Sequence, residues 1–228
     1  MSSKLLTYRS DPDFEEQPPF MKFRLFYDGS LKSARGEDYQ DRRREHKHDI
    51  RMEFHHQLKH LWKIAPAIKD LQGGYDILGI PRPEGQNKLI DQPLFRDVLA
   101  EQYIIAGQKF VPLVVEAVGL NCSIDVLMLR QDRPGGVLKP RDIDNRLKVL
   151  FDALRVPRNA TEFTPAPEGN EPIFVLLEDD SLVSNVRVET DDLLADPING
   201  DDSFVRLILT IDVRPYRTTM FNLSYAGE

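Results

Sequence analysis

The chain has 228 residues, 41% of them hydrophobic and 29% charged, and a net charge of −7. This composition is typical of a soluble globular domain, and no apolar run reaches the ~18 residues that a membrane-spanning helix needs. The first residues lack the apolar core of a signal peptide, and the one cysteine, Cys122, excludes an internal disulfide. We therefore expect a single domain in a reducing cytoplasm, without membrane contact.

The acidic residues are unevenly distributed along the chain. Residues 178–202 hold nine Asp and Glu side chains against one base, Arg187, so the rest of the chain is close to neutral. The net charge of a protein affects its association with other molecules and does not determine its fold. The overall value of −7 therefore does not exclude a nucleic-acid partner.

The N-terminal part of the chain predicts an arm, a strand and a long helix. Residues 1–20 are polar and contain three prolines, so we expect a flexible arm. Residues 21–27 alternate between apolar and polar and predict a strand. Residues 37–63 lack Gly and Pro and predict a long helix. Its apolar stripe would comprise Ile50, Phe54, Leu58, Leu61 and Trp62.

The middle of the chain is less regular. Glycine and proline punctuate residues 64–110, which we interpret as an insertion. It would contain a short helix over Asp91–Gln102 with Pro93 in the first turn. Residues 111–129 are apolar and predict one or two strands, followed by a loop at 132–136.

The next predicted element is an amphipathic helix over residues 142–154. Its buried stripe would comprise Leu147, Leu150, Phe151 and Leu154. Residues 156–172 contain four prolines and predict a long surface loop. Residues 173–177 then form a short apolar segment that leads into an acidic cluster.

Two further strands complete the predicted fold. Residues 182–189 and 204–213 alternate in polarity, and the acidic segment 191–202 between them fits an exposed hairpin loop. We expect an α+β domain over residues 21–215, with a small mixed β-sheet flanked by helices, and a tail at 216–228.

Aspartates gather at the start of the helix over 142–154 and again after the apolar segment. Asp142 and Asp144 would lie at the helix start, and Asp179 and Asp180 follow the segment. Carboxylates this close repel one another unless a cation lies among them, and their oxygens suit hard metal ions. The set therefore indicates a Mg²⁺ site for phosphodiester hydrolysis. Helix capping or a turn explains any one of them better, so the hypothesis depends on the whole set.

Lys148 follows Asp144 by one helical turn, and Asp152 follows Lys148 by another along the same helix edge. An ammonium group beside the acids could stabilise charge on a reacting phosphate or orient the attacking water. The alternative is an ordinary salt bridge between Lys148 and Asp144.

Together these residues resemble the motif of the RusA family of Holliday-junction resolvases. That motif has a basic loop, Asp-x-Asp-Asn, a lysine three residues after the Asn, a helical Asp-Ala-Leu, and an Asp-Asp pair before a Val-rich strand. The matching residues are Lys139-Pro140-Arg141, Asp142-Ile143-Asp144-Asn145, Lys148, Asp152-Ala153-Leu154, and Asp179-Asp180 before Val183. The resemblance is close over 115–213, is looser over 20–63 and does not extend to 64–110.

The resemblance implies a RusA-like fold and a homodimeric, Mg²⁺-dependent endodeoxyribonuclease, with Mn²⁺ as a substitute metal. Such an enzyme cuts Holliday (four-way) junctions by paired nicks in DNA recombination and repair. The resemblance also implies that Asp142, Asp144 and Asp180 are catalytic metal ligands and that Lys148 is a catalytic lysine. Asp179 would be a further metal ligand. A cytoplasmic protein of bacterial or phage origin fits this family.

Basic residues around the motif predict contacts with DNA phosphates. The candidates are Arg130, Arg133, Lys139, Arg141 and Arg146. A solvated loop balanced by nearby acids is an equally good interpretation for any one of them. The helix over 37–63 carries all five histidines, and His56 and His60 have metal-binding spacing. No cysteine accompanies them, so we interpret these histidines as part of a charged helix face. Contact of this face with DNA, with a second subunit or with neither stays open.

Two alternative functions stay open. One is a related nuclease that acts on other branched or foreign DNA, and the other is a DNA-binding or assembly subunit that keeps the fold without catalysis. A sugar-nucleotide enzyme with a metal-binding Asp-x-Asp lacks support, because the chain has no Gly-rich turn after a strand.

Overall fold

A computed structural model describes residues 21–32, 40–84, 92–130, 140–164, 171–194, 203–219 and 221–223, without the side chains of residues 40–43 and 140–142. The expected N-terminal arm, the loop at 132–136 and most of the acidic segment 191–202 lie outside these residues. The described part is a mixed α+β structure with two small sheets, rather than the single sheet expected, and a few helices. Among the helices in these ranges, none is long and apolar enough to span a membrane.

The larger sheet has four strands in the order β1-β7-β4-β6. They are β1 (Met21–Ser30), β4 (Leu120–Arg130), β6 (Val183–Asp192) and β7 (Phe204–Pro215). Strand β7 is antiparallel to both β1 and β4, whereas β6 is parallel to β4 and lies at the edge. The expected hairpin between β6 and β7 is wrong, because β4 lies between them. The alternating patterns of β6 and β7 are similar and do not specify which neighbouring strand each one pairs with.

The smaller sheet has three strands in the order β2-β3-β5. They are β2 (Ile104–Ile105), β3 (Gln108–Val114) and β5 (Ile173–Leu177). Strands β3 and β5 are parallel, and all five residues of β5 are buried. A continuous apolar strand is typical of a parallel pair covered on both faces.

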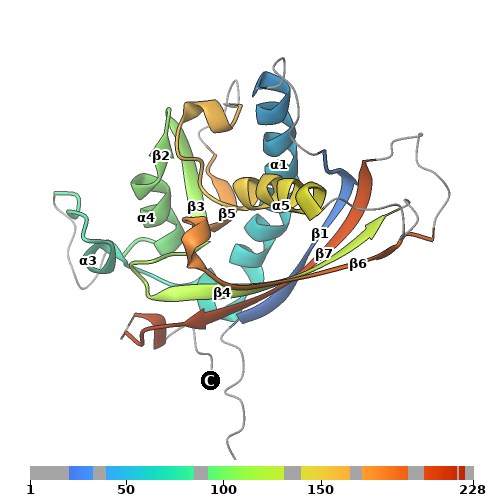
Figure 1. The fold of residues 1–228 in the computed structure, drawn as a ribbon. Helices are drawn as coiled ribbons and strands as arrows, with labels where there is room; N and C mark the ends of the chain where they lie inside the picture. Colours follow the sequence, from blue (N-terminus) through green and yellow to red (C-terminus); the bar gives the residue numbers. More distant parts are fainter. Residues whose placement is uncertain are drawn as a thin grey trace, which may run out of the picture.

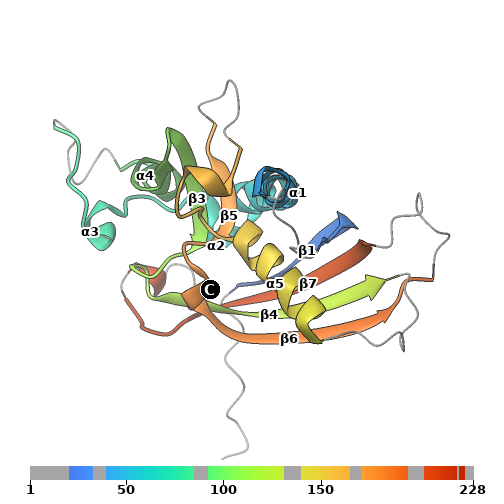
Figure 2. The ribbon, with the colours of Figure 1, turned by 45° about the horizontal axis from the view of Figure 1, so that its top comes forward.

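Two long helices cover one face of the larger sheet (Figures 1 and 2). Helix α1 (Gln40–Ile64) buries four of the five predicted stripe residues, and Leu61 is partly buried. Helix α5 (Pro140–Leu154) crosses the same face, with Leu150 and Leu154 fully buried and Leu147 and Phe151 partly buried. Amphipathic spacing therefore predicted both helices within a few residues of their ends.

Helix α1 is also joined to the smaller sheet by a buried hydrogen bond. His55 Nδ1 accepts a hydrogen bond from the backbone N–H of Phe174 in β5 at 2.9 Å. Burial, and then the neighbouring His56 and Lys59, lower the pKa of His55 to about 4. Because Nδ1 must be unprotonated to accept this bond, the neutral ring is the form that fits the fold.

The described part of the segment 64–110 packs into the main core. It contains α2 (Pro66–Lys69), α3 (Tyr75–Leu78) and α4 (Phe95–Gln102). Phe95 and Leu99 of α4 are fully buried in the main core cluster. The expected position of Pro93 in the first turn of this helix is wrong, because the N-cap is Leu94 and Pro93 precedes it.

The described part of the loop over 156–172 is fixed to the body by a small second core. Phe163 is fully buried and packs edge-on against Phe110 of β3, with ring centroids 5.4 Å apart. Just before it, a 3₁₀ turn, η2 (Ala160–Glu162), is capped by the Asn159 side chain, which accepts from the backbone N–H of Thr161. This turn positions the residues that follow α5 beside the acidic cluster after β5.

Candidate active site

A pocket of about 550 Å³ lies where α5 meets the start of β6. Its lining combines polar groups with an apolar wall. The residues are Lys148, Phe151 and Asp152 from α5, Arg158 from the following loop, Asp180 and Ser181 from the turn after β5, and Val183 and Val186 from β6. Lys148 and Asp152 of the motif helix and Asp180 of the acidic pair, which are far apart in sequence, therefore meet at one pocket, and Asp144 and Asp179 are not part of its lining.

The acidic cluster after β5 has members with different roles. Glu178 Oε2 accepts the backbone N–H of Glu116 at 2.8 Å, which joins the ends of two strands. Asp179 is the N-cap of the 3₁₀ turn η3 (Asp180–Leu182), and its Oδ1 accepts the backbone N–H of Ser181 at 3.0 Å. That bond is the main cause that lowers the pKa of Asp179 to about 2. Capping therefore accounts for Asp179, as the alternative interpretation held for a single acid.

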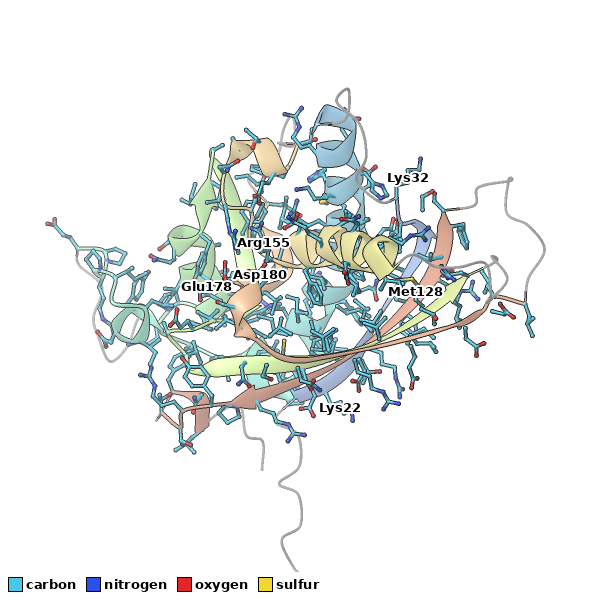
Figure 3. All side chains as sticks on the ribbon, in the orientation of Figure 1. Lys22, Lys32, Met128, Arg155, Glu178 and Asp180 are labelled. Atoms are coloured by element: carbon cyan, nitrogen blue, oxygen red, sulfur yellow. The ribbon has the colours of Figure 1, made fainter. Side chains whose placement is uncertain are left out.

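Asp180 is the acid of this cluster that faces the pocket, and 46% of its side chain is exposed. In Figure 3, Asp180 and Arg155 lie at the same end of α5, whereas Lys22 is on the opposite side of the larger sheet. The exposure of the Asp180 side chain leaves its carboxylate accessible to a ligand from solvent.

Arg158 places a positive charge on the acidic pair. Its Nη2 atom lies 3.3 Å from Asp179 Oδ2 and 3.1 Å from Asp180 Oδ1. The sequence motif did not single out this residue, because it lies in the loop after α5 and outside the family pattern. The two neighbouring acids thus already hold a cation, in the form of a guanidinium group.

Lys148 is exposed and lines the same pocket. In the part of the chain that the structure describes, it forms no salt bridge with Asp144, so the alternative of an ordinary i,i+4 pair is not realised. Asp144 is exposed four residues earlier on α5, about 6 Å along the helix axis. The ammonium of Lys148 is therefore available to a ligand in the pocket.

The expected metal ligands fit a hard cation by their chemistry but do not form a complete set in the described residues. Asp142 lies in the first turn of α5, and its side chain is among those not described. Among the described side chains, no three His, Cys, Asp or Glu groups converge closely enough to hold a metal ion. The oxygen donors of Asp144 and Asp180 suit Mg²⁺, and the acidic pair already attracts a cation.

Asp152 shares the pocket wall but is committed to a buried charge network. Its carboxylate contacts Lys47 Nζ at 3.4 Å and Arg155 Nη2 at 3.0 Å, and its backbone oxygen accepts from Arg51 Nη2 at 2.7 Å. Arg155 also pairs with Glu162 at 3.0 Å. Arg51 and Arg155 are 1% and 2% exposed, and burial is the main cause that lowers the pKa of Arg51 to about 10. This network ties α1, α5 and η2 together beneath the pocket.

The predicted DNA-contacting residues are placed unfavourably or are not described. Arg130 and Arg146 are 4% and 8% exposed, so direct phosphate contact by these two does not fit the arrangement. Their positions on a strand and on the inner side of α5 turn the side chains into the body. Arg133 and Lys139 lie outside the described residues, as does the side chain of Arg141.

The cysteine is buried, whereas the spaced histidines are exposed. Cys122 is fully buried, as expected, and burial raises its thiol pKa to about 12. His56 and His60 are exposed on α1, and no third ligand joins them within the described ranges.

Searches against protein-family models, curated proteins and solved structures found no match to this chain.

Proposed function

We propose that this protein is a Mg²⁺-dependent endodeoxyribonuclease that cuts branched DNA, with the four-way junction as its preferred substrate. The observation that carries the proposal is the shared pocket, where Lys148 from α5 and Asp180 from the turn after β5 face the same space. The resemblance of the surrounding motif to the RusA family supports the same activity. We further propose that the protein acts in the cytoplasm, in DNA recombination and repair.

The residues at the pocket divide the work of phosphodiester hydrolysis among them. Asp180 would hold the metal at the pocket through its carboxylate oxygens. The family resemblance adds Asp142 and Asp144 as further ligands, and these two are not among the residues that line this pocket. When bound, Mg²⁺ would lower the pKa of the attacking water and place positive charge beside the phosphate. Lys148 would donate a hydrogen bond to a phosphate oxygen and stabilise the charge that develops during cleavage.

The buried network beneath the pocket would hold α5 in place during this reaction. Lys47, Arg155 and Asp152 fix the end of the helix on which Lys148 is carried. A catalytic group must be held closely, because a misplacement of about 1 Å can cost on the order of a hundredfold in rate. A homodimer with two such sites would place paired nicks on opposing strands of a junction.

The test is cleavage of three DNA substrates of matched sequence: a four-way junction, a replication fork and a linear duplex. Each is incubated with Mg²⁺, with Mn²⁺ and with EDTA, and the positions of the nicks are mapped on each strand. The proposal expects paired nicks in the junction with either metal and none with EDTA. Equal cutting of all three substrates would instead support a nuclease of other or foreign DNA. Binding of the junction without cutting under any condition would support a non-catalytic subunit.

A further inference from the structure

Arg158 is anchored through its main chain while its charged end stays exposed. Its backbone N–H donates to Glu162 Oε2 at 3.1 Å, and Glu162 is itself held by the buried Arg155. By contrast, 59% of the Arg158 side chain is exposed. The main-chain anchor therefore does not depend on where the guanidinium lies, and the long side chain can change its position.

The guanidinium contacts one carboxylate oxygen of each member of the acidic pair. A single atom, Nη2, contacts Asp179 at 3.3 Å and Asp180 at 3.1 Å, so one cation offsets the repulsion between two adjacent acids. A divalent ion on Asp180 would compete for the same oxygens and would be repelled by the guanidinium. The two cations therefore cannot both occupy this face of the acidic pair at low cost.

We propose that Arg158 is a built-in competitor of the metal ion, which holds the acidic pair in the metal-free protein and is displaced when the metal binds. This inference rests on the proposed function. The displaced guanidinium would still be tethered at the pocket that Lys148 also lines. Arginine binds phosphate through a planar fork of donors, so the displaced side chain would contact the DNA phosphate there.

The proposal gives Arg158→Gln two effects of opposite sign, which a purely structural residue would not have. Loss of the competitor should tighten metal binding, because the ion no longer has to displace a partner. A half-exposed ion pair contributes about 0.2–1 kcal/mol, which corresponds to roughly a 1.4- to fivefold gain in affinity. Loss of the phosphate contact should weaken DNA binding in the presence of metal.

Mn²⁺ binding in the absence of DNA is measured by electron paramagnetic resonance for the wild type, Arg158→Gln, Arg158→Lys and Arg187→Gln. Arg187 is the matched control, because it is an exposed arginine paired with Glu189 on β6 and lines a different pocket. We expect tighter binding for Arg158→Gln and wild-type affinity for the lysine variant and the control. Unchanged or weaker Mn²⁺ binding by a folded Arg158→Gln would overturn the proposal.

Junction binding is then measured for the same proteins with Ca²⁺ in place of Mg²⁺, so that the DNA stays intact. We expect Arg158→Gln to bind about three- to tenfold more weakly than Arg187→Gln, as expected for one lost phosphate contact. Equal DNA binding by the two variants would remove the phosphate role. If the wild type binds no Mn²⁺ and cuts no DNA, the proposed function fails and the inference fails with it. If it binds and cuts but Arg158→Gln binds Mn²⁺ no more tightly, only the role of Arg158 is lost.

Discussion

Two aspartates of the same motif line one pocket and differ in what surrounds them. The Asp152 side chain is 13% exposed and lies between Lys47 and Arg155, with its charge balanced by buried cations. The Asp180 side chain is 46% exposed, and its salt bridge among the described residues is to the exposed guanidinium of Arg158. Asp152 therefore stabilises the structure, whereas Asp180 can exchange its partner for a ligand.

The comparison shows why sequence spacing alone does not assign a carboxylate to catalysis. Asp152 lies on the same helix edge as Lys148, and by spacing it is as good a candidate as Asp144. A buried charge must keep its partners, because an unpaired one costs several kcal/mol, and it is thus a poor site for a reversible ligand. The exposure of the side chain and its ion-pair partners distinguish the structural role of Asp152 from the proposed metal-binding role of Asp180.

The largest effect is expected for Asp180→Asn. Loss of the ligand charge should lower Mg²⁺-dependent junction cleavage on the order of a thousandfold, since a bound metal contributes several kcal/mol to the transition state. Single-turnover nicking measures the rate. Asp125→Asn is the control, because Asp125 is an exposed aspartate on the opposite face of β4. Equal rates for the two variants would contradict the role of Asp180.

Asp152→Asn should change stability instead. Removing this charge leaves Lys47 and Arg155 without their shared partner and should lower the free energy of unfolding by about 3 kcal/mol. Urea denaturation measures this value, and Asp180→Asn should stay within about 0.5 kcal/mol of the wild type. A destabilised Asp180→Asn together with an unaffected Asp152→Asn would reverse the comparison.

Lys148→Met should impair cleavage without weakening the metal site. Its ammonium has no salt bridge within the described residues, so its loss should leave stability and Mn²⁺ affinity near wild-type values. Cleavage should fall about a hundredfold, as for the loss of one transition-state donor. Lys22→Met, on the opposite side of the sheet, is the control and should cleave normally. Normal cleavage by Lys148→Met would exclude a catalytic role.

The smallest expected effect is a change in stability with pH that arises from the buried His55. Its pKa is about 4 in the folded protein and near its ordinary value of 6.5 when unfolded. The unfolded chain therefore takes up the proton first, and the stability that His55 contributes is complete above pH 6.5 and is lost as pH falls toward 4. Between pH 7.5 and pH 5 the loss should be about 1–2 kcal/mol, after allowance for solvent screening.

The measurement is the free energy of unfolding at these two pH values for the wild type and two variants. His55→Gln keeps a hydrogen-bond acceptor without a titrating ring, so its stability should change less with pH than that of the wild type. His60→Gln removes an exposed histidine of the same helix and should follow the wild type. Identical pH dependence in all three proteins would show that the His55 bond does not respond to protonation.

Local patterns predicted the elements that carry the site but not their pairing. The apolar stripes of α1 and α5 and the alternation of β1 were sufficient, because each pattern depends on one element packing on one core. The parallel pairing of β3 with β5, and of β4 with β6, joins segments far apart in sequence. No local signal specifies such partners.

The site shows the same limit at the level of single residues. The motif predicted that Lys148 and Asp180 would meet, and both line one pocket. It could not predict Arg158, since only the turn after α5 brings this residue to the acidic pair. Nor could it predict that Arg130 and Arg146 are buried. The identity of a basic residue beside a motif does not indicate whether its side chain faces solvent or the core.

The central claim is that the motif's separated acids form one cation site, and the most direct test is the position of bound Mn²⁺. The anomalous signal of crystals soaked in Mn²⁺ locates the ion independently of any activity. We predict a peak within bonding distance of a carboxylate oxygen of Asp180, with Asp142 or Asp144 of α5 as a further ligand. A protein that cuts junction DNA but binds Mn²⁺ only elsewhere, for example at His56 and His60, would contradict the claim.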